Sequence, residues 1–93
     1  MDRRQAVEIG KRELASYRAL SYEELVASIG NDGGFERGSE AGEDYQVEFE
    51  CFWDDRENKN IRVSAAISYS GWTDFLPVST DFIMTPDGSF IGE

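Results

Sequence analysis

Residues 45–69 constrain the fold most, because two runs of alternating apolar and polar side chains flank one hydrophilic stretch. The first run alternates these apolar residues with polar ones: Tyr45, Val47, Phe49, Cys51 and Trp53. The second does the same with Ile61, Val63, Ala65, Ile67 and Tyr69. Side chains of a β-strand alternate between its two faces, so each run predicts a strand with one buried face. The charged residues 54–60 between them suit a hairpin loop.

Pairing about this loop sets an expected register for the hairpin. On the apolar face it places Phe49 beside Ala65 and Val47 beside Ile67, and on the polar face Glu50 beside Ser64 and Phe52 beside Arg62. The apolar face needs a cover from the rest of the chain. The polar face is expected to stay in water, as antiparallel sheets allow.

Two helices are expected before the hairpin. The first spans residues 2–17 and carries an apolar stripe formed by Ala6, Val7, Gly10, Leu14 and Tyr17. Gly10 costs about 1 kcal/mol relative to alanine in a helix, and its expected use is a close approach to the next layer. The second helix begins after Ser21, which forms a capping box with Glu24, and Gly30 ends it.

Residues 30–44 are rich in glycine and acidic side chains and predict a long connection without regular structure. Phe35 is its one apolar anchor and is expected to pin the connection to the domain. The alternative is a calcium site on its carboxylates, although the spacing of an EF-hand is absent.

The last part of the chain completes an α+β fold. A third strand is expected over residues 78–85, with Val78, Thr80, Phe82 and Met84 on one side and Ser79, Asp81 and Ile83 on the other. A turn follows at residues 86–89, and Phe90 and Ile91 are expected to return as a short fourth strand. We therefore predict one α+β domain over residues 1–93, in which two N-terminal helices pack on one face of a three- to four-stranded antiparallel sheet, in the order ααβββ.

The charge of the chain excludes some partners and favours others. The formal net charge is −10, and no lysine or arginine follows Arg62. Such a field repels nucleic acid and favours a basic protein as partner. No stretch is apolar enough to span a membrane or to serve as a signal peptide. The single cysteine, Cys51, is expected in the core, which fits a reducing, cytoplasmic setting.

The chain has few residues of the types that usually carry out catalysis, so we predict no catalytic residue, no metal site and no cofactor. Histidine is absent, which removes the commonest general base and zinc ligand. We expect partner-binding residues on the polar sheet face and near its edge, namely Glu48, Glu50, Phe52, Arg62 and Trp72. Such a surface suits a protein partner, for example a basic toxin neutralised by an immunity-like inhibitor. A sheet face with no partner at all is the plainest alternative.

Two further functional alternatives remain open. One is a small-molecule or carbohydrate-binding domain that uses Trp53, Trp72 and nearby carboxylates. The other is a carboxylate-based hydrolase, since Glu48 and Glu50 lie on one strand face about 7 Å apart, from the rise per residue of a strand. The second requires an active-site cleft that nothing in the sequence indicates.

The second half of the chain resembles a group of small uncharacterised bacterial proteins. The similar stretches are 53–54, 60–63, 71–72, 81–83 and above all the closing segment 86–93, with the letters PDGSFIGE. The likeness covers roughly residues 44–93. It implies a bacterial, cytosolic protein with a natural C-terminus, and it implies no activity, cofactor or catalytic residue.

Overall fold

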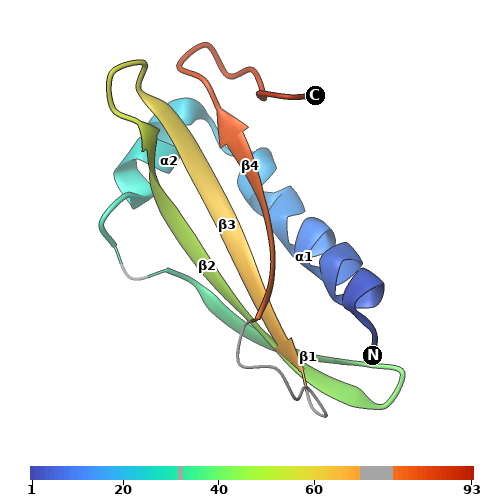
Figure 1. Ribbon diagram of the computed structural model, residues 1–93. Helices are drawn as coiled ribbons and strands as arrows, with labels where there is room; N and C mark the ends of the chain where they lie inside the picture. Colours follow the sequence, from blue (N-terminus) through green and yellow to red (C-terminus); the bar gives the residue numbers. More distant parts are fainter. Residues whose placement is uncertain (32, 70–76) are drawn as a thin grey trace.

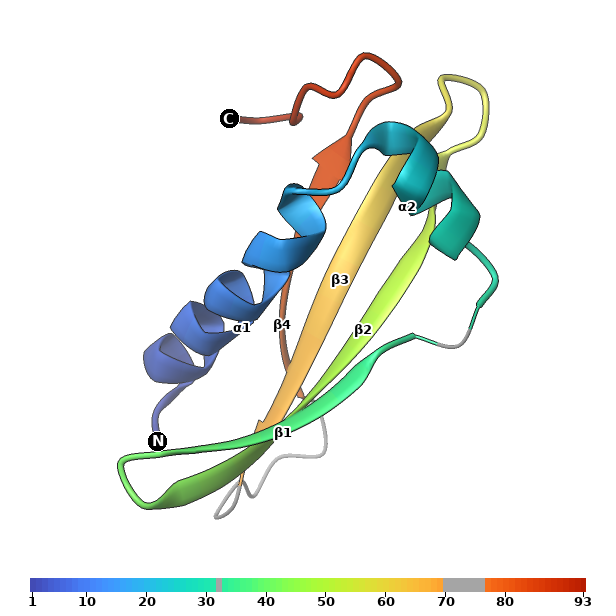
Figure 2. The same ribbon diagram turned by 180° about the vertical axis from the view of Figure 1, so that it is seen from behind.

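Two helices precede a four-stranded sheet in the computed structural model, which describes residues 1–31, 33–69 and 77–93. The elements are α1 (Arg3–Arg18), α2 (Tyr22–Ser28), β1 (Phe35–Glu40), β2 (Glu43–Asp55), β3 (Asn60–Tyr69) and β4 (Val78–Met84). The strands pair antiparallel in the order β1-β2-β3-β4. Both helices lie on the same side of this sheet (Figures 1 and 2). The expected α+β architecture is therefore confirmed.

The central hairpin has the predicted register. Phe49 pairs with Ala65 and Val47 with Ile67 on the side of the helices, while Glu50 pairs with Ser64 and Phe52 with Arg62 on the other side. Val47, Val63 and Ile67 are completely buried. A bulge between Trp53 and Asp55 lets β2 continue to Asp55, so this strand is longer than the sequence pattern predicted.

Helix α1 packs against β3 and β4. Its buried residues are Ala6, Ile9, Gly10 and Leu14, so the predicted stripe omitted Ile9. Val7 and Tyr17 lie at its borders and are partly buried. The helix begins with a capping box that the sequence pattern had not indicated, in which Asp2 and Gln5 each bond the other's backbone N–H.

Helix α2 has the predicted start. The Ser21 hydroxyl accepts a hydrogen bond from the Glu24 backbone N–H, and the Glu24 carboxylate accepts one from the Ser21 backbone N–H. Leu25 is completely buried and joins α2 to the core. Gly30 follows the helix with a φ of 84°, the left-handed conformation expected after a helix end.

The expected loop over residues 30–44 is wrong in its second half, where the structure has strand β1. Residues 35–40 do not alternate between apolar and polar, because β1 is an edge strand that contributes little to the core. Its order comes from backbone pairing with β2 around a tight turn at Ala41 and Gly42, both of which have positive φ. Phe35 was expected to anchor a loop, yet its side chain lies on the side away from the helices and is 46% exposed.

The fourth strand is β1 and not the predicted segment at Phe90 and Ile91. Phe90 makes a single isolated bridge with Met84, and the Ile91 N–H donates to the Ile83 carbonyl. This segment therefore covers one end of the β4 edge without becoming a strand.

Candidate functional site

The side of the sheet opposite the helices, here called the open face, carries the residues predicted to bind a partner. No helix of the described residues covers it (Figures 1 and 2). The strand registers align its side chains in rows across the sheet. From the end nearest the β2–β3 turn, these rows are Phe52–Arg62–Ile83, then Glu50–Ser64–Asp81, then Phe35–Glu48–Ala66–Ser79.

The structure brings four of the five predicted residues together on this face. Glu48 and Glu50 are exposed at neighbouring same-face positions of β2. Phe52 and Arg62 are direct cross-strand neighbours and are both partly buried. Trp72 lies outside the described residues.

Arg62 is held between two carboxylates. Its Nε donates to Asp54 at 2.8 Å, and its Nη1 donates to Asp81 at 2.6 Å. These hydrogen bonds, led by the one to Asp54, raise the pKa of the Arg62 guanidinium above its ordinary value. The Arg62 charge is thus neutralised within the protein, which leaves this arginine less available to a partner than the sequence suggested.

Sequence reasoning missed both carboxylates of this bridge. Asp54 was assigned to the hairpin loop, and the bulge that keeps it in β2 has no clear sequence signal. Asp81 was placed on the polar side of the third strand, but its approach to Arg62 depends on how β4 pairs with β3.

Strand β1 adds an aromatic ring and a cation to the open face. Phe35 lies opposite Glu48, and Arg37 lies opposite Gln46. The Arg37 guanidinium carbon is 5.4 Å from the centroid of the Phe35 ring, within the range of a cation–π contact. The glycine and serine residues in β1 concealed this strand in the sequence, and only the Ala41–Gly42 turn could have indicated it.

The open face is acidic among the described residues. Its carboxylates are Asp44, Glu48, Glu50, Asp54 and Asp81, and its cations are Arg37 and Arg62. Arg62 is already paired with two of these acids. The described residues offer no salt-bridge partner to Glu48 or Glu50, so both carboxylates face water with their charge uncompensated.

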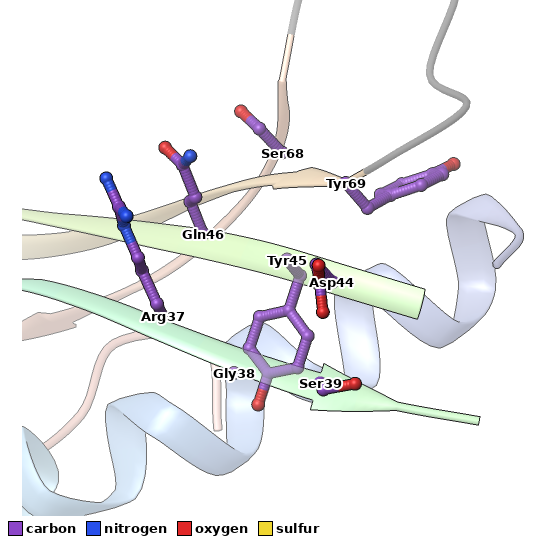
Figure 3. Close-up of a pocket in the computed structure, with 8 residues that line it drawn as sticks. All are labelled: Arg37, Gly38, Ser39, Asp44, Tyr45, Gln46, Ser68 and Tyr69. Atoms are coloured by element: carbon purple, nitrogen blue, oxygen red, sulfur yellow. The ribbon is translucent and has the colours of Figure 1, made fainter. Parts of the chain in front are cut away.

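A hollow of about 750 Å³ lies at the end of the sheet near the β1–β2 turn. Its lining residues are Arg37, Gly38, Ser39, Asp44, Tyr45, Gln46, Ser68 and Tyr69. Figure 3 shows the side chains of Arg37, Gln46 and Ser68 on one side of the sheet and the Tyr45 ring on the other. The Tyr45 hydroxyl accepts a hydrogen bond from Arg12 of α1, which in turn pairs with Glu40. These contacts fix the β1–β2 end of the sheet against α1.

The alternatives that rest on Trp53 or on a metal ion find little geometric support in the described residues. Trp53 lies on the helix side and packs partly buried against the core, so it is no stacking platform on the open face. The described residues hold no group of three or more acidic or cysteine side chains placed to bind a metal ion, although Asp32 of the acidic segment is not among them. Cys51 is partly buried, and its thiol donates to the Leu25 carbonyl.

Comparisons with known proteins leave the site to be judged from its geometry. No protein-family model matches the chain, and no curated protein or solved structure is significantly similar to it. Among the described residues, no helix has both the length and the apolar character needed to span a membrane.

Proposed function

We propose that the protein is a non-enzymatic, cytoplasmic binding protein whose open face docks a basic protein partner. The observation that carries the proposal is the pair Glu48 and Glu50, exposed on a face that no described helix covers and without a salt bridge among the described residues. Unpaired acids on one surface attract a cationic partner and raise its rate of association.

The apolar side chains of the open face supply the contact area that charge alone does not. Phe35 is 46% exposed and lies opposite Glu48, and Phe52 lies two positions from Glu50 on the same strand face. Aromatic side chains next to charged ones are typical of the residues that dominate binding energy at interfaces. An immunity-like inhibitor of a basic toxin is the concrete form that fits the acidic charge and the resemblance to small bacterial proteins.

Affinity capture from a bacterial lysate at low and at high salt tests this function. The wild-type protein is expected to retain a basic protein at low salt and to release it at high salt. The double variant Glu48→Lys/Glu50→Lys is expected to retain at least about tenfold less, because two attractive contacts become repulsive. The matched control Glu8→Lys/Glu13→Lys changes the net charge equally on α1, on the other side of the sheet, and should still bind.

Two outcomes would overturn the proposal. If the wild-type protein retains nothing at low salt, electrostatic docking is excluded. If both double variants lose binding equally, the overall charge of the chain and not the open face governs the interaction.

The hollow near the β1–β2 turn favours a second candidate function, the binding of a small polar ligand such as a carbohydrate. Its lining includes the Arg37 guanidinium and the Gln46 amide on the open face, polar groups that bind the hydroxyls of sugars. NMR titration with a panel of sugars and metabolites tests it. Shifts confined to the amides of Arg37, Gln46 and Ser68 would support this function, and a panel without any shift there would exclude it for the compounds used.

A further inference from the structure

Strand β2 continues well past the strand that borders it. The pairing of β1 with β2 ends where Phe35 meets Glu48, and one further hydrogen bond joins the Phe49 N–H to the Gly34 carbonyl at 2.9 Å. From there β2 runs on to Asp55 with β3 on one side only (Figures 1 and 2). We call this stretch, residues 50–55, the half-edge of β2. At the rise of a strand it is about 17 Å long.

The backbone of the half-edge points toward the missing neighbour. The Phe49 N–H is directed away from β3, toward Gly34. Alternate residues of an antiparallel strand direct their N–H and C=O groups to the same side, so those of Cys51 and Trp53 also point away from β3. The described residues place no strand opposite them. A row of such groups, unpaired among the described residues, is a template for an added strand.

Helix α2 and a small hollow give this half-edge a defined border. The Cys51 thiol donates to the Leu25 carbonyl of α2 at 3.4 Å, which places the helix beside the strand. A hollow of about 210 Å³ opens where β1 ends, lined among others by Ser28, Gly33 and Glu50. An exposed strand edge with a hollow beside it for a side chain is a recurring kind of site for extended peptides.

Gly33 lets the connecting segment approach β2 closely where the half-edge begins. A Cβ on residue 33 would lie 1.5 Å from the Phe49 carbonyl oxygen, so the connecting segment passes directly against β2 there. A larger residue would push the segment outward and away from Gly34, where β1 pairing begins. The chain thus brings its own neighbour strand close only at the beginning of the half-edge.

The charges around the half-edge select the occupant. The half-edge and the turn after it carry the acidic side chains Glu50, Asp54, Asp55 and Glu57, and the first turn of α2 adds Glu23 and Glu24. The cations nearby are Arg56 and Lys59 of the turn, and Arg62, which is already bridged to Asp54 and Asp81. A second copy of the chain, which carries a net charge of −10, would be repelled. A basic segment would be attracted.

We propose that the half-edge of β2 takes an extended, basic segment of the partner as an added strand, next to α2. This inference rests on the proposed function and names the contact through which the basic partner is held. The other two strand edges are less suited. Strand β1 carries charges of both signs, Glu36 on its helix side and Arg37 on the open face, and the Ile91 N–H already occupies the Ile83 carbonyl on β4.

Hydrogen exchange with a defined probe tests the added strand. The probe is the peptide Ac-KVRVKV-NH2, and its control has the same sequence with alternate backbone nitrogens methylated, which keeps the charge and removes the ladder hydrogen bonds. At low salt and nine-tenths occupancy, exchange of the Cys51 and Trp53 amides is expected to slow about tenfold, since only the free fraction exchanges. The methylated peptide should give no such protection.

The outcomes separate this inference from the proposed function. Protection at Cys51 and Trp53 by the unmodified peptide alone supports the added strand. A second outcome is that both peptides bind, that neither protects these amides, and that Glu48→Lys/Glu50→Lys abolishes binding. This outcome would overturn the added strand and leave docking on the open face in place. If neither peptide binds at low salt, both proposals fail.

Discussion

Gly10 of α1 and Thr80 of β4 lie so close that no side chain fits between helix and sheet. A Cβ on residue 10 would be 2.5 Å from the Thr80 Cγ2 and 2.6 Å from the Ile67 Cδ1. Both distances are far below the 3.5–4.0 Å or so at which carbon atoms attract each other. The glycine therefore sets the distance at which α1 covers β3 and β4.

Gly10→Ala is expected to destabilise the protein, although alanine is the better helix former. The gain in helix propensity is about 1 kcal/mol, whereas forcing an extra methyl into a packed interior costs about 1–3 kcal/mol. We expect a net loss of about 1 kcal/mol in the free energy of unfolding, measured by urea denaturation. The double variant Gly10→Ala/Thr80→Ser should recover part of this loss, because serine lacks the clashing methyl. A Gly10→Ala protein as stable as wild type would show that the layers separate without cost.

Replacing Arg62 with methionine tests the bridge on the open face. Methionine keeps much of the apolar stem but leaves Asp54 and Asp81 without the cation that joins them. Because all three groups are partly exposed, the expected loss is small, about 0.5–1 kcal/mol at low ionic strength. The loss should shrink when salt is added.

Arg56→Met is the matched control for this experiment. Arg56 lies exposed in the β2–β3 turn, and the described residues give it no carboxylate partner. The variant removes the same charge without breaking a bridge, so its stability should change by a few tenths of a kcal/mol at most. Equal losses in both variants would mean that net charge, and not the bridge, is responsible.

The hairpin could be predicted from the sequence because its information is local. The alternation of apolar and polar residues in β2 and β3 indicates which face each side chain occupies, and the charged turn sets the register. The pairing of Phe52 with Arg62 could therefore be predicted directly. The same reasoning placed Glu48 and Glu50 in water. The capping box at Ser21 is equally local, since all its atoms lie within four residues.

The missed features depend on contacts between distant segments. β1 contributes no buried alternating side chains, and its order comes from backbone hydrogen bonds that any sequence provides. The bridge of Arg62 to Asp81 depends on the pairing of β4 with β3, which no pattern within one strand reveals. The half-edge of β2 likewise exists because β2 is longer than β1, and it can be recognised only when the positions of both strands are known.

Asp87 is expected to make the turn at residues 86–89 sensitive to acid. Its carboxylate accepts hydrogen bonds from the Thr85 hydroxyl and the Ser89 backbone N–H. These bonds, led by the one from Thr85, lower the pKa of Asp87 from 3.8 to about 2. A lowered pKa in the folded state means that the stabilisation is complete above pH 3.8 and is lost as the pH falls toward 2.

NMR titration of the Asp87 carboxyl and of the Ser89 amide measures this effect. Both signals should share a midpoint near pH 2, and the Ser89 amide should lose its protection over the same range. In Asp87→Asn the Ser89 amide should no longer titrate in this range, because no proton is taken up. An Asp87 midpoint at the ordinary 3.8 would contradict the hydrogen bonds that the structure places there.

Leu25→Ala is expected to release α2 from the sheet. The helix has 7 residues, and helices this short do not persist in water without packing. Leu25 is its one completely buried side chain, and truncating such a leucine costs about 2–5 kcal/mol. Urea denaturation measures the total loss. Exchange of the Leu25 amide, which donates to the Ser21 carbonyl, measures the local one.

The thiol of Cys51 reports separately on whether α2 has detached. Burial raises the pKa of this thiol, and its hydrogen bond ends on the Leu25 carbonyl. In Leu25→Ala the thiol should react faster with a thiol-specific reagent at neutral pH, because it becomes accessible and its pKa falls toward the ordinary value. The control Ala27→Gly changes an exposed position of the same helix and costs about 1 kcal/mol of helix propensity. Comparable thiol reactivity in the two variants would show that helix propensity, and not the burial of Leu25, holds α2 beside the half-edge of β2.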